Sequence, residues 1–175
     1  MRPLRQLAGA LCASVTMVVS LAGTSHADPG DFTMRNMNSG KCLSVPAAST
    51  SFEYLNQFTC NNYVDQYWYR QYVESDANGV AWYKIINRHS GLCLSVDGAS
   101  LDDYAWITQY PCGQPKPYPD QYWRETDYDA NTGGYHIRNR NSNKCLAILD
   151  GSMNEAAWAI QYSCGSWRDH YWKLS

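Results

Sequence analysis

The sequence predicts an all-β protein made of three copies of one unit of four short strands. The main observation is a motif that occurs three times. It begins with Asn, any two residues, Ser, then either Gly or Asn, any one residue, and Cys-Leu. After a loop it continues with an aromatic residue two places before a second cysteine, and it closes with Tyr-Trp. The copies span 36–68, 87–123 and 139–172. Their first cysteines, Cys42, Cys93 and Cys145, are 51 and 52 residues apart, which is long enough for four strands with their turns and too long for one helical pair.

The opening strand of each copy is predicted from alternating apolar and polar residues, the pattern of a strand buried on one face. These segments are 32–37, 83–88 and 135–140. A Gly or Asn follows each of them, at Gly40, Gly91 and Asn143. Because these residue types best tolerate positive φ, a left-handed turn is expected there.

The other three strands follow in the same order in every copy. The second begins at Cys-Leu, the third runs into the second cysteine, and the fourth holds the closing residues at 66–68, 121–123 and 170–172. Asn78-Gly79 and Gly133-Gly134 predict tight turns between copies. No segment has the length and period of an amphipathic helix.

Burial of the apolar side chains requires the three units to close around a common axis, since one four-strand unit would leave its apolar face in water. The expected core contains Leu43, Leu94, Leu146, Trp68, Trp123 and Trp172. Twelve strands in three equal units describe a β-trefoil, with repeats at approximately 32–73, 82–127 and 134–175.

The N-terminus is expected to be a signal peptide. Arg2 and Arg5 precede an apolar stretch at 7–23, and Ser25-His26-Ala27 forms a small-residue cleavage pattern. We therefore predict a signal peptide at 1–27 and one secreted, extracellular domain at 28–175. No later segment approaches the ~20 apolar residues of a membrane-spanning helix. A monomer is expected.

Charge and cysteine content narrow the function classes. Without Arg2 and Arg5 the chain keeps 12 of its 14 basic residues against 16 acidic ones, a net charge of −4 that disfavours nucleic acid as a partner. Six cysteines remain in an exported chain, which favours disulfides over metal ligation. Only pairing within copies respects the repeat, and it predicts Cys42 with Cys60, Cys93 with Cys112 and Cys145 with Cys164.

The repeated motif resembles the ricin B-chain-like lectins, including family 13 carbohydrate-binding modules. The resemblance rests on the Cys-Leu-(Ser/Ala)-(Val/Ile) segment, the aromatic residue two places before the second cysteine, and the Gln-x-Trp ending. It covers nearly all of 28–175. It implies a β-trefoil that binds glycans without catalysis in shallow pockets, up to one per copy.

A pocket of this family uses an Asp two places after the first cysteine, a polar residue four before the second, an aromatic two before it, and an Asn-Gln pair before the Trp. The resemblance assigns Ser44, Asn56, Phe58, Asp65 and Gln66 to the first pocket and Ser95, Thr108, Tyr110, Asp120 and Gln121 to the second. The third has Ala147, Ile160, Tyr162, Asp169 and His170. Among the residues of the third copy, only Tyr162 is a predicted sugar contact. None of the copies has the family's Asp.

Several of these residues also have a structural interpretation. The closing tryptophans are expected in the core, and Gln66 and Gln121 could satisfy backbone groups instead of contacting sugar. The repeated Gln57, Gln109 and Gln161 are interpreted as structural. Phe58, Tyr110 and Tyr162 are either sugar platforms or packed surface residues. Tyr54, Trp106 and Trp158 are predicted to widen those platforms, and Asp97, Asp103 or Glu155 to replace the missing carboxylate.

Metal and catalytic sites are not expected. The acidic turns at 74–79 and 127–133 alternate oxygen ligands, but Ile85 and Arg138 stand where a calcium loop needs its closing Glu. His89, His136 and His170 lie in no catalytic motif. Asp169 and His170 are predicted to point to opposite faces of a strand. No cofactor, metal or enzymatic activity is therefore predicted.

Two functions remain open. The first is a secreted carbohydrate-binding protein whose partner is a polysaccharide or a cell-surface glycan. The alternative is a trefoil that has lost sugar binding and acts as an inhibitor or as a subunit of a secreted complex. The alternative is favoured by an insertion stiffened by Pro111, Pro115, Pro117 and Pro119 in the second copy.

Overall fold

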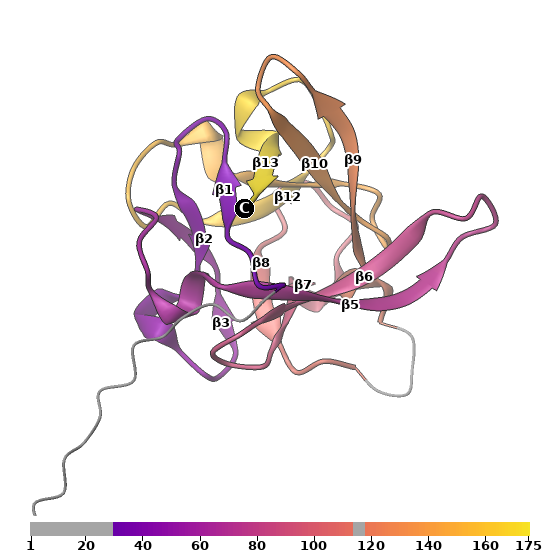
Figure 1. Ribbon diagram of the computed structural model, residues 1–175, viewed down its shortest axis with the longest axis horizontal. Helices are drawn as coiled ribbons and strands as arrows, with labels where there is room; N and C mark the ends of the chain where they lie inside the picture. The colour runs from indigo at the N-terminus through magenta and orange to yellow at the C-terminus, as the bar shows by residue number, and fades with distance from the viewer. Residues whose placement is uncertain (1–29, 114–117) are drawn as a thin grey trace, which may run out of the picture.

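The computed structural model describes residues 30–113 and 118–175 (Figure 1). The predicted signal peptide at 1–27 and Pro115 and Pro117 of the insertion lie outside the described residues. In the described ranges the chain forms one 13-stranded sheet interrupted by short 3-10 helices. No helix in these ranges is both long enough and apolar enough to cross a membrane.

The strands follow the predicted repeat. The first repeat contains β1 (Met34–Asn36), β2 (Cys42–Ser44), β3 (Glu53–Tyr54), β4 (Asn56–Phe58) and β5 (Trp68–Ser75). The second contains β6 (Ala81–Asn87), β7 (Cys93–Val96), β8 (Ile107–Tyr110) and β9 (Trp123–Asp129), and the third contains β10 (Gly134–Asn139), β11 (Cys145–Ile148), β12 (Ala159–Tyr162) and β13 (Tyr171–Leu174). Twelve strands occupy the predicted positions, and the two-residue β3 is additional.

Two 3-10 helices accompany each repeat. One follows the second strand: η1 (Pro46–Ala48), η3 (Asp97–Ala99) and η5 (Leu149–Gly151). The other precedes the fourth strand: η2 (Val64–Gln66), η4 (Pro119–Gln121) and η6 (Arg168–His170). The prediction that the fourth strands include Gln66, Gln121 and His170 is therefore wrong, because these residues end a 3-10 turn.

The first and fourth strands of the repeats close into a barrel. Antiparallel pairs join β1 to β13, β13 to β10, β10 to β9, β9 to β6 and β6 to β5. An isolated bridge between Phe32 and Trp68 joins β5 to the segment just before β1 and completes the ring. The β5–β6 hairpin projects from this barrel (Figure 1).

The second and third strands form one hairpin in each repeat, β2–β4, β7–β8 and β11–β12. The hairpins meet through β3–β8 pairing and through bridges from Asn56 to Trp158 and from Trp106 to Ile160. A barrel built from three hairpin-bearing units is the predicted β-trefoil.

The closing tryptophans form the centre of the core, as predicted. Trp68, Trp123 and Trp172 have no solvent-exposed surface. Each indole Nε1 donates a hydrogen bond to the carbonyl of the buried leucine that follows the first cysteine of its repeat. The acceptors are Leu43 at 3.4 Å, Leu94 at 2.9 Å and Leu146 at 2.9 Å. The buried indole donors are thus satisfied.

The three disulfides are those predicted: Cys42–Cys60, Cys93–Cys112 and Cys145–Cys164. Their Cα atoms are 5.0 to 5.1 Å apart. Each disulfide ties the start of the second strand to the end of the third.

The left-handed turns are also confirmed, with φ of 71° at Gly40, 71° at Gly91 and 59° at Asn143. The asparagine that opens each motif stabilises this turn: Asn36 Oδ1, for example, accepts hydrogen bonds from two backbone N–H groups. Its Nδ2 donates to the carbonyl of Asp169 at 2.7 Å, across the boundary between repeats. Equivalent 2.7 Å bonds from Asn87 to Asp65 and from Asn139 to Asp120 fix the 3-10 helices that precede the fourth strands.

A second set of buried amides, which we call the glutamine clasp, joins each repeat to another. Gln57, Gln109 and Gln161 form it, and all three are fully buried. Gln109 Nε2 donates to two carbonyl oxygens of the first repeat, at 2.8 and 2.7 Å, while its Oε1 accepts a bond from Ser90. Gln57 reaches the third repeat and Gln161 the second in the same way. Their predicted structural role is confirmed.

Candidate carbohydrate-binding site

A hollow beside the β7–β8 hairpin brings together the five residues predicted for the second pocket. This second-repeat cavity has a volume of about 330 Å³. Ser95, Thr108, Tyr110, Asp120 and Gln121 line it, with Tyr118 and the η3 turn. Residues from three separate segments therefore converge on one concave surface, as a ligand site requires.

The equivalent hollow in the third repeat is equally large, although its residues depart most from the family pattern. This third-repeat cavity has a volume of about 340 Å³. Its lining includes the five equivalent residues Ala147, Ile160, Tyr162, Asp169 and His170, and also Tyr104, Asp150 and Trp167. Ala147 and Ile160 replace the Ser and Thr of the second repeat, and the hollow is still present.

The first repeat keeps the same arrangement of side chains. The Ser44 hydroxyl donates to Asp65 Oδ2, which also accepts the backbone N–H of Val45 at 3.1 Å. Asn56 is 7% exposed, and its Oδ1 has no hydrogen-bond partner. Phe58 lies at the end of β4 with its ring exposed.

A carboxylate is present in every repeat, but it comes from a different position of the motif than the family pattern leads one to expect. Asp65, Asp120 and Asp169 stand one place before Gln66, Gln121 and His170. In the second repeat Ser95 Oγ donates to Asp120 Oδ2 at 2.7 Å. The Ser thus occupies the family's Asp position, and the Asp occupies the family's Asn position. The sequence shows an Asp at this place in all three copies, and the resemblance had already assigned these residues to the pockets.

Burial perturbs two of these carboxyl groups. Burial raises the pKa of Asp120, and the hydrogen bond from Ser95 opposes this effect. Burial also raises the pKa of Asp169, opposed by the neighbouring His170. Ala147 supplies no hydroxyl to Asp169. A buried carboxylate that lines a cavity is suited to accept hydrogen bonds from a ligand.

A second aromatic side chain faces each predicted platform, which sequence reasoning missed. Tyr63, Tyr118 and Trp167 stand three places before Gln66, Gln121 and His170. Ring centroids of Phe58 and Tyr63 are 6.3 Å apart, and those of Tyr162 and Trp167 are 6.0 Å apart. In the second repeat Tyr110 and Tyr118 line the same cavity. Because an aromatic residue stands at this position in all three copies, the sequence alone could have revealed these second aromatic residues.

Gln66 and Gln121 are held by the main chain. Both side chains are fully buried. Gln121 Nε2 donates to the carbonyl of Pro111 at 3.1 Å, and its Oε1 accepts the N–H of Gly113 at 2.9 Å. Gln66 makes the same two contacts, to Thr59 and Asn61, at 3.0 Å each. These contacts support the structural interpretation of Gln66 and Gln121.

His170 replaces this glutamine in the third repeat. Its Nε2 lies 3.8 Å from Asp169 Oδ2, and its buried Nδ1 has no hydrogen-bond partner. The prediction that the two side chains point to opposite faces is wrong, because η6 is a 3-10 helix and not a strand. Burial lowers the pKa of His170, so the imidazole is neutral at neutral pH. No Ser, Thr or Cys is among the residues that line this cavity.

Tyr54, Trp106 and Trp158 do not widen the platforms as predicted. They turn toward one another between the repeats, with ring centroids 6.3 Å apart both for Tyr54 with Trp106 and for Trp106 with Trp158. We call these residues the axial aromatic cluster. None of the three lines the second-repeat or third-repeat cavity.

Of the three acidic residues proposed to replace the family's Asp, Asp97 is the one that lines the second-repeat or the third-repeat cavity in the described ranges. Asp103 pairs with Lys144 at 2.6 Å, and Glu155 pairs with Lys41 at 2.8 Å. Both ion pairs connect different repeats, so these two carboxylates have a structural role.

The two acidic turns are explained by turn chemistry. Asp76 Oδ1 accepts the backbone N–H groups of Asn78 and Val80 at 2.9 and 3.0 Å, while Oδ2 pairs with Arg124 at 3.0 Å. Asp129 Oδ1 accepts the N–H of Asn131 at 2.9 Å. These carboxylates complete the hairpin turns between β5 and β6 and between β9 and β10.

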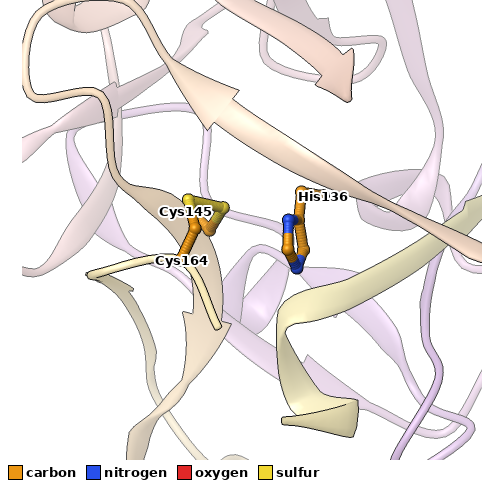
Figure 2. Close-up of side chains that lie close together, drawn as sticks. All are labelled: His136, Cys145 and Cys164. Carbon is orange, nitrogen blue, oxygen red and sulfur yellow. A yellow bond between two sulfur atoms is a disulfide. The ribbon is translucent and has the colours of Figure 1, made fainter. Parts of the chain in front are cut away.

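One group in the described ranges has the spacing of metal ligands: His136, Cys145 and Cys164. Figure 2 shows the imidazole beside the two sulfur atoms, which are bonded to each other. Metal ligation by cysteine requires a thiolate, which a disulfide cannot provide. The imidazole also has its own partners, Asp127 Oδ2 at 3.3 Å and the carbonyl of Gly165 at 3.1 Å. The group is a packed part of the third repeat.

Comparison with solved structures supports the assignment of the fold. A designed threefold symmetric protein, ThreeFoil, is 31% identical with a TM-score of 0.73, and the match covers 83% of this chain and 97% of that one. An exo-β-1,3-galactanase from Clostridium thermocellum is 28% identical with a TM-score of 0.74, over 84% of this chain but only 30% of the enzyme. The C-terminal half of an earthworm R-type lectin, solved with GalNAc, has a TM-score of 0.62 at 14% identity, over 84% of this chain and 98% of that one, and shares the fold.

No curated protein sequence is significantly similar to this chain. A family model described as ricin-type β-trefoil lectin domain-like matches residues 18–110 and, in a second alignment, 66–162. The two alignments together cover most of the chain. The repeats, the disulfides, the fold and this match agree, and the chain belongs to the family of ricin-type β-trefoil lectin-like domains.

Proposed function

We propose that the protein is secreted and binds polysaccharide or cell-surface glycans without catalysing a reaction. The observation that carries this proposal is the second-repeat cavity, where Tyr110 and Tyr118 share a concave surface with Asp120. An aromatic ring covers the apolar C–H face of a sugar, and a carboxylate accepts hydrogen bonds from its hydroxyl groups. The predicted signal peptide and the three disulfides support secretion.

Repetition of the site supports a polymeric ligand. The second-repeat and third-repeat cavities have similar volumes and lie in equivalent places of one rigid fold. A glycan chain or a glycan-covered surface can occupy more than one site at once, which raises avidity without requiring a tight single site. Shallow pockets therefore suffice for attachment.

A glycan array combined with pull-down on insoluble polysaccharides tests the proposal. Binding to a defined glycan is expected. Tyr110→Ala and Tyr162→Ala should each weaken it, and the double variant should weaken it more. Tyr72→Ala is a matched control, because Tyr72 is 60% exposed and lies in β5 outside both cavities. Absence of binding to any glycan at millimolar concentration would refute the proposal.

The second candidate function is protein binding by a trefoil that no longer recognises sugar. The axial aromatic cluster favours it, because Trp106 and Trp158 are 38% and 39% exposed and lie beside each other. Adjacent exposed aromatic side chains are typical of interaction sites. If Trp106→Ala abolished binding to a secreted protein and Tyr110→Ala did not, protein binding would be the better description.

A further inference from the structure

We infer that the second-repeat and third-repeat cavities select a glycan that carries free amino groups, such as a polymer of de-N-acetylated amino sugars. This inference rests on the proposed function and names the ligand class of the same site. It follows from the distribution of charge around the two cavities.

Each of the two cavities contains two carboxylates. Asp97 and Asp120 line the second-repeat cavity, and Asp150 and Asp169 line the third. In both, one carboxylate comes from the turn after the second strand and the other from the 3-10 helix before the fourth. Among the residues that the structure describes, no Lys or Arg lines either cavity. The described lining of each cavity therefore carries negative charge.

The inner carboxylate of each cavity lacks a permanent cationic partner. Asp120 and Asp169 are 6% and 7% exposed. Within the described residues, neither forms an ion pair with Lys or Arg, and the His170 beside Asp169 is neutral because burial lowers its pKa. A desolvated carboxylate without a cation is unfavourable. A ligand ammonium group would supply the missing charge.

The aromatic walls also suit a cation. In the third-repeat cavity the ring centroids of Tyr104 and Tyr162 are 4.9 Å apart, and those of Tyr162 and Trp167 are 6.0 Å apart. Aromatic faces attract ammonium groups through their quadrupole as well as covering apolar C–H groups. Asp150 lines the same cavity as Tyr104 and Tyr162, so its negative charge lies near these rings.

The first repeat provides an internal contrast. Its turn after the second strand is Pro46-Ala47-Ala48, which has no acidic residue. Of the two carboxylate positions found in the other repeats, the first repeat therefore keeps one, Asp65. A neutral sugar would need only this one carboxylate for its hydroxyl groups. The additional Asp97 and Asp150 favour a charged amine, and they would repel glycans that carry carboxylate or sulfate groups.

The experiment compares matched oligosaccharides in the protein spanning 28–175. Glucosamine and galactosamine hexamers are titrated calorimetrically against their N-acetylated counterparts at pH 6 and low salt. The amine forms should bind at least about tenfold more tightly, and about 0.5 M salt should reduce this preference. The double variant Asp97→Asn/Asp150→Asn should lose most of it, whereas Asp102→Asn, at an exposed position outside both cavities, should retain it.

The outcomes separate this inference from the proposed function. Equal or tighter binding of the N-acetylated or other neutral glycans would overturn the preference for amines and leave glycan binding intact. An amine preference that persists unchanged in the double variant would also overturn it, because the paired carboxylates of each cavity would then not be its cause. Binding to no glycan would remove the inference together with the proposed function.

Discussion

The second-repeat and third-repeat cavities have nearly the same volume, about 330 and 340 Å³, but different polar groups. In the second, the Ser95 hydroxyl holds Asp120, and Gln121 is bound to the main chain. In the third, Ala147 leaves Asp169 without that hydroxyl, and His170 replaces the glutamine. The cavity is maintained in both cases although its wall chemistry has changed.

This difference indicates that the framework and the pocket are determined by separate residues. The disulfides, the closing tryptophans and the glutamine clasp are present in every copy and position the backbone. The residues at the pocket surface contribute less to this framework. They can therefore differ between repeats while the hollow remains.

Removal of a disulfide should have the largest effect and should be the same in both repeats. The double variants Cys93→Ala/Cys112→Ala and Cys145→Ala/Cys164→Ala each open a loop of 19 residues. Each should lose about 3 kcal/mol of unfolding free energy, because the unfolded chain gains conformational freedom. Urea unfolding measures this quantity. A difference of more than about 1 kcal/mol between the two variants would mean that the frameworks are not equivalent.

Removal of the second aromatic wall should weaken glycan binding in both cavities. Tyr118→Ala and Trp167→Ala should each reduce the affinity of their own site about tenfold, which corresponds to about 1.4 kcal/mol, with Trp167 giving the larger loss because its ring is larger. Trp167 is 56% exposed, so folding should be little affected. Calorimetric titration with the best array ligand provides the measurement. If neither variant changed affinity, the aromatic side chains would be surface residues only.

Exchange of the pocket serine and alanine should change stability in opposite directions. Ser95→Ala removes the 2.7 Å hydrogen bond to Asp120 and should cost about 1 kcal/mol. Ala147→Ser gives Asp169 a further donor, beside the backbone N–H groups that already donate to it, and should be neutral or slightly stabilising. Both are measured by urea unfolding at pH 7. If both variants were destabilised by a similar amount, the hydroxyl would stabilise the second-repeat pocket but destabilise the third-repeat pocket.

The smallest effect is expected for the pH dependence of stability in His170→Gln, which restores the residue of the other repeats. Burial lowers the pKa of His170 below 6.5, so the unfolded chain takes up this proton at a higher pH than the folded protein does. Stability should therefore fall as the pH decreases below about 6.5 and be unaffected by this group above it. Thermal unfolding between pH 5 and 8 should show a smaller decline in His170→Gln.

The exposed His89 provides the control for this measurement. His89→Gln should keep the pH profile of the unchanged protein. An unchanged profile in His170→Gln would show that protonation of this imidazole is not linked to unfolding.

The fold could be predicted from the sequence because the residues that determine it are repeated. Cysteine spacing gave the disulfides, and Gly or Asn at the same position gave the left-handed turns. The second-repeat cavity was also anticipated, since all five of its assigned residues converge there. These successes depend on local patterns that tolerate little variation.

Two of the errors concern residues whose surroundings are set by other repeats. Tyr54, Trp106 and Trp158 were placed by their position within one strand, whereas they pack across repeat boundaries. Asp103 and Glu155 bind lysines of another repeat. A period within one copy carries no information about contacts between copies, so these placements needed the structure.

The glutamine clasp has a consequence for how this architecture can change in size. Gln57 binds carbonyl groups of the third repeat, Gln109 those of the first and Gln161 those of the second. The contacts form a cycle, so removal or addition of one copy would leave buried carbonyl groups without donors. Linear repeat proteins contact only their neighbours and can lengthen. The cyclic contacts of this chain therefore favour three copies, and divergence of the existing copies is a route to new recognition that leaves these contacts intact.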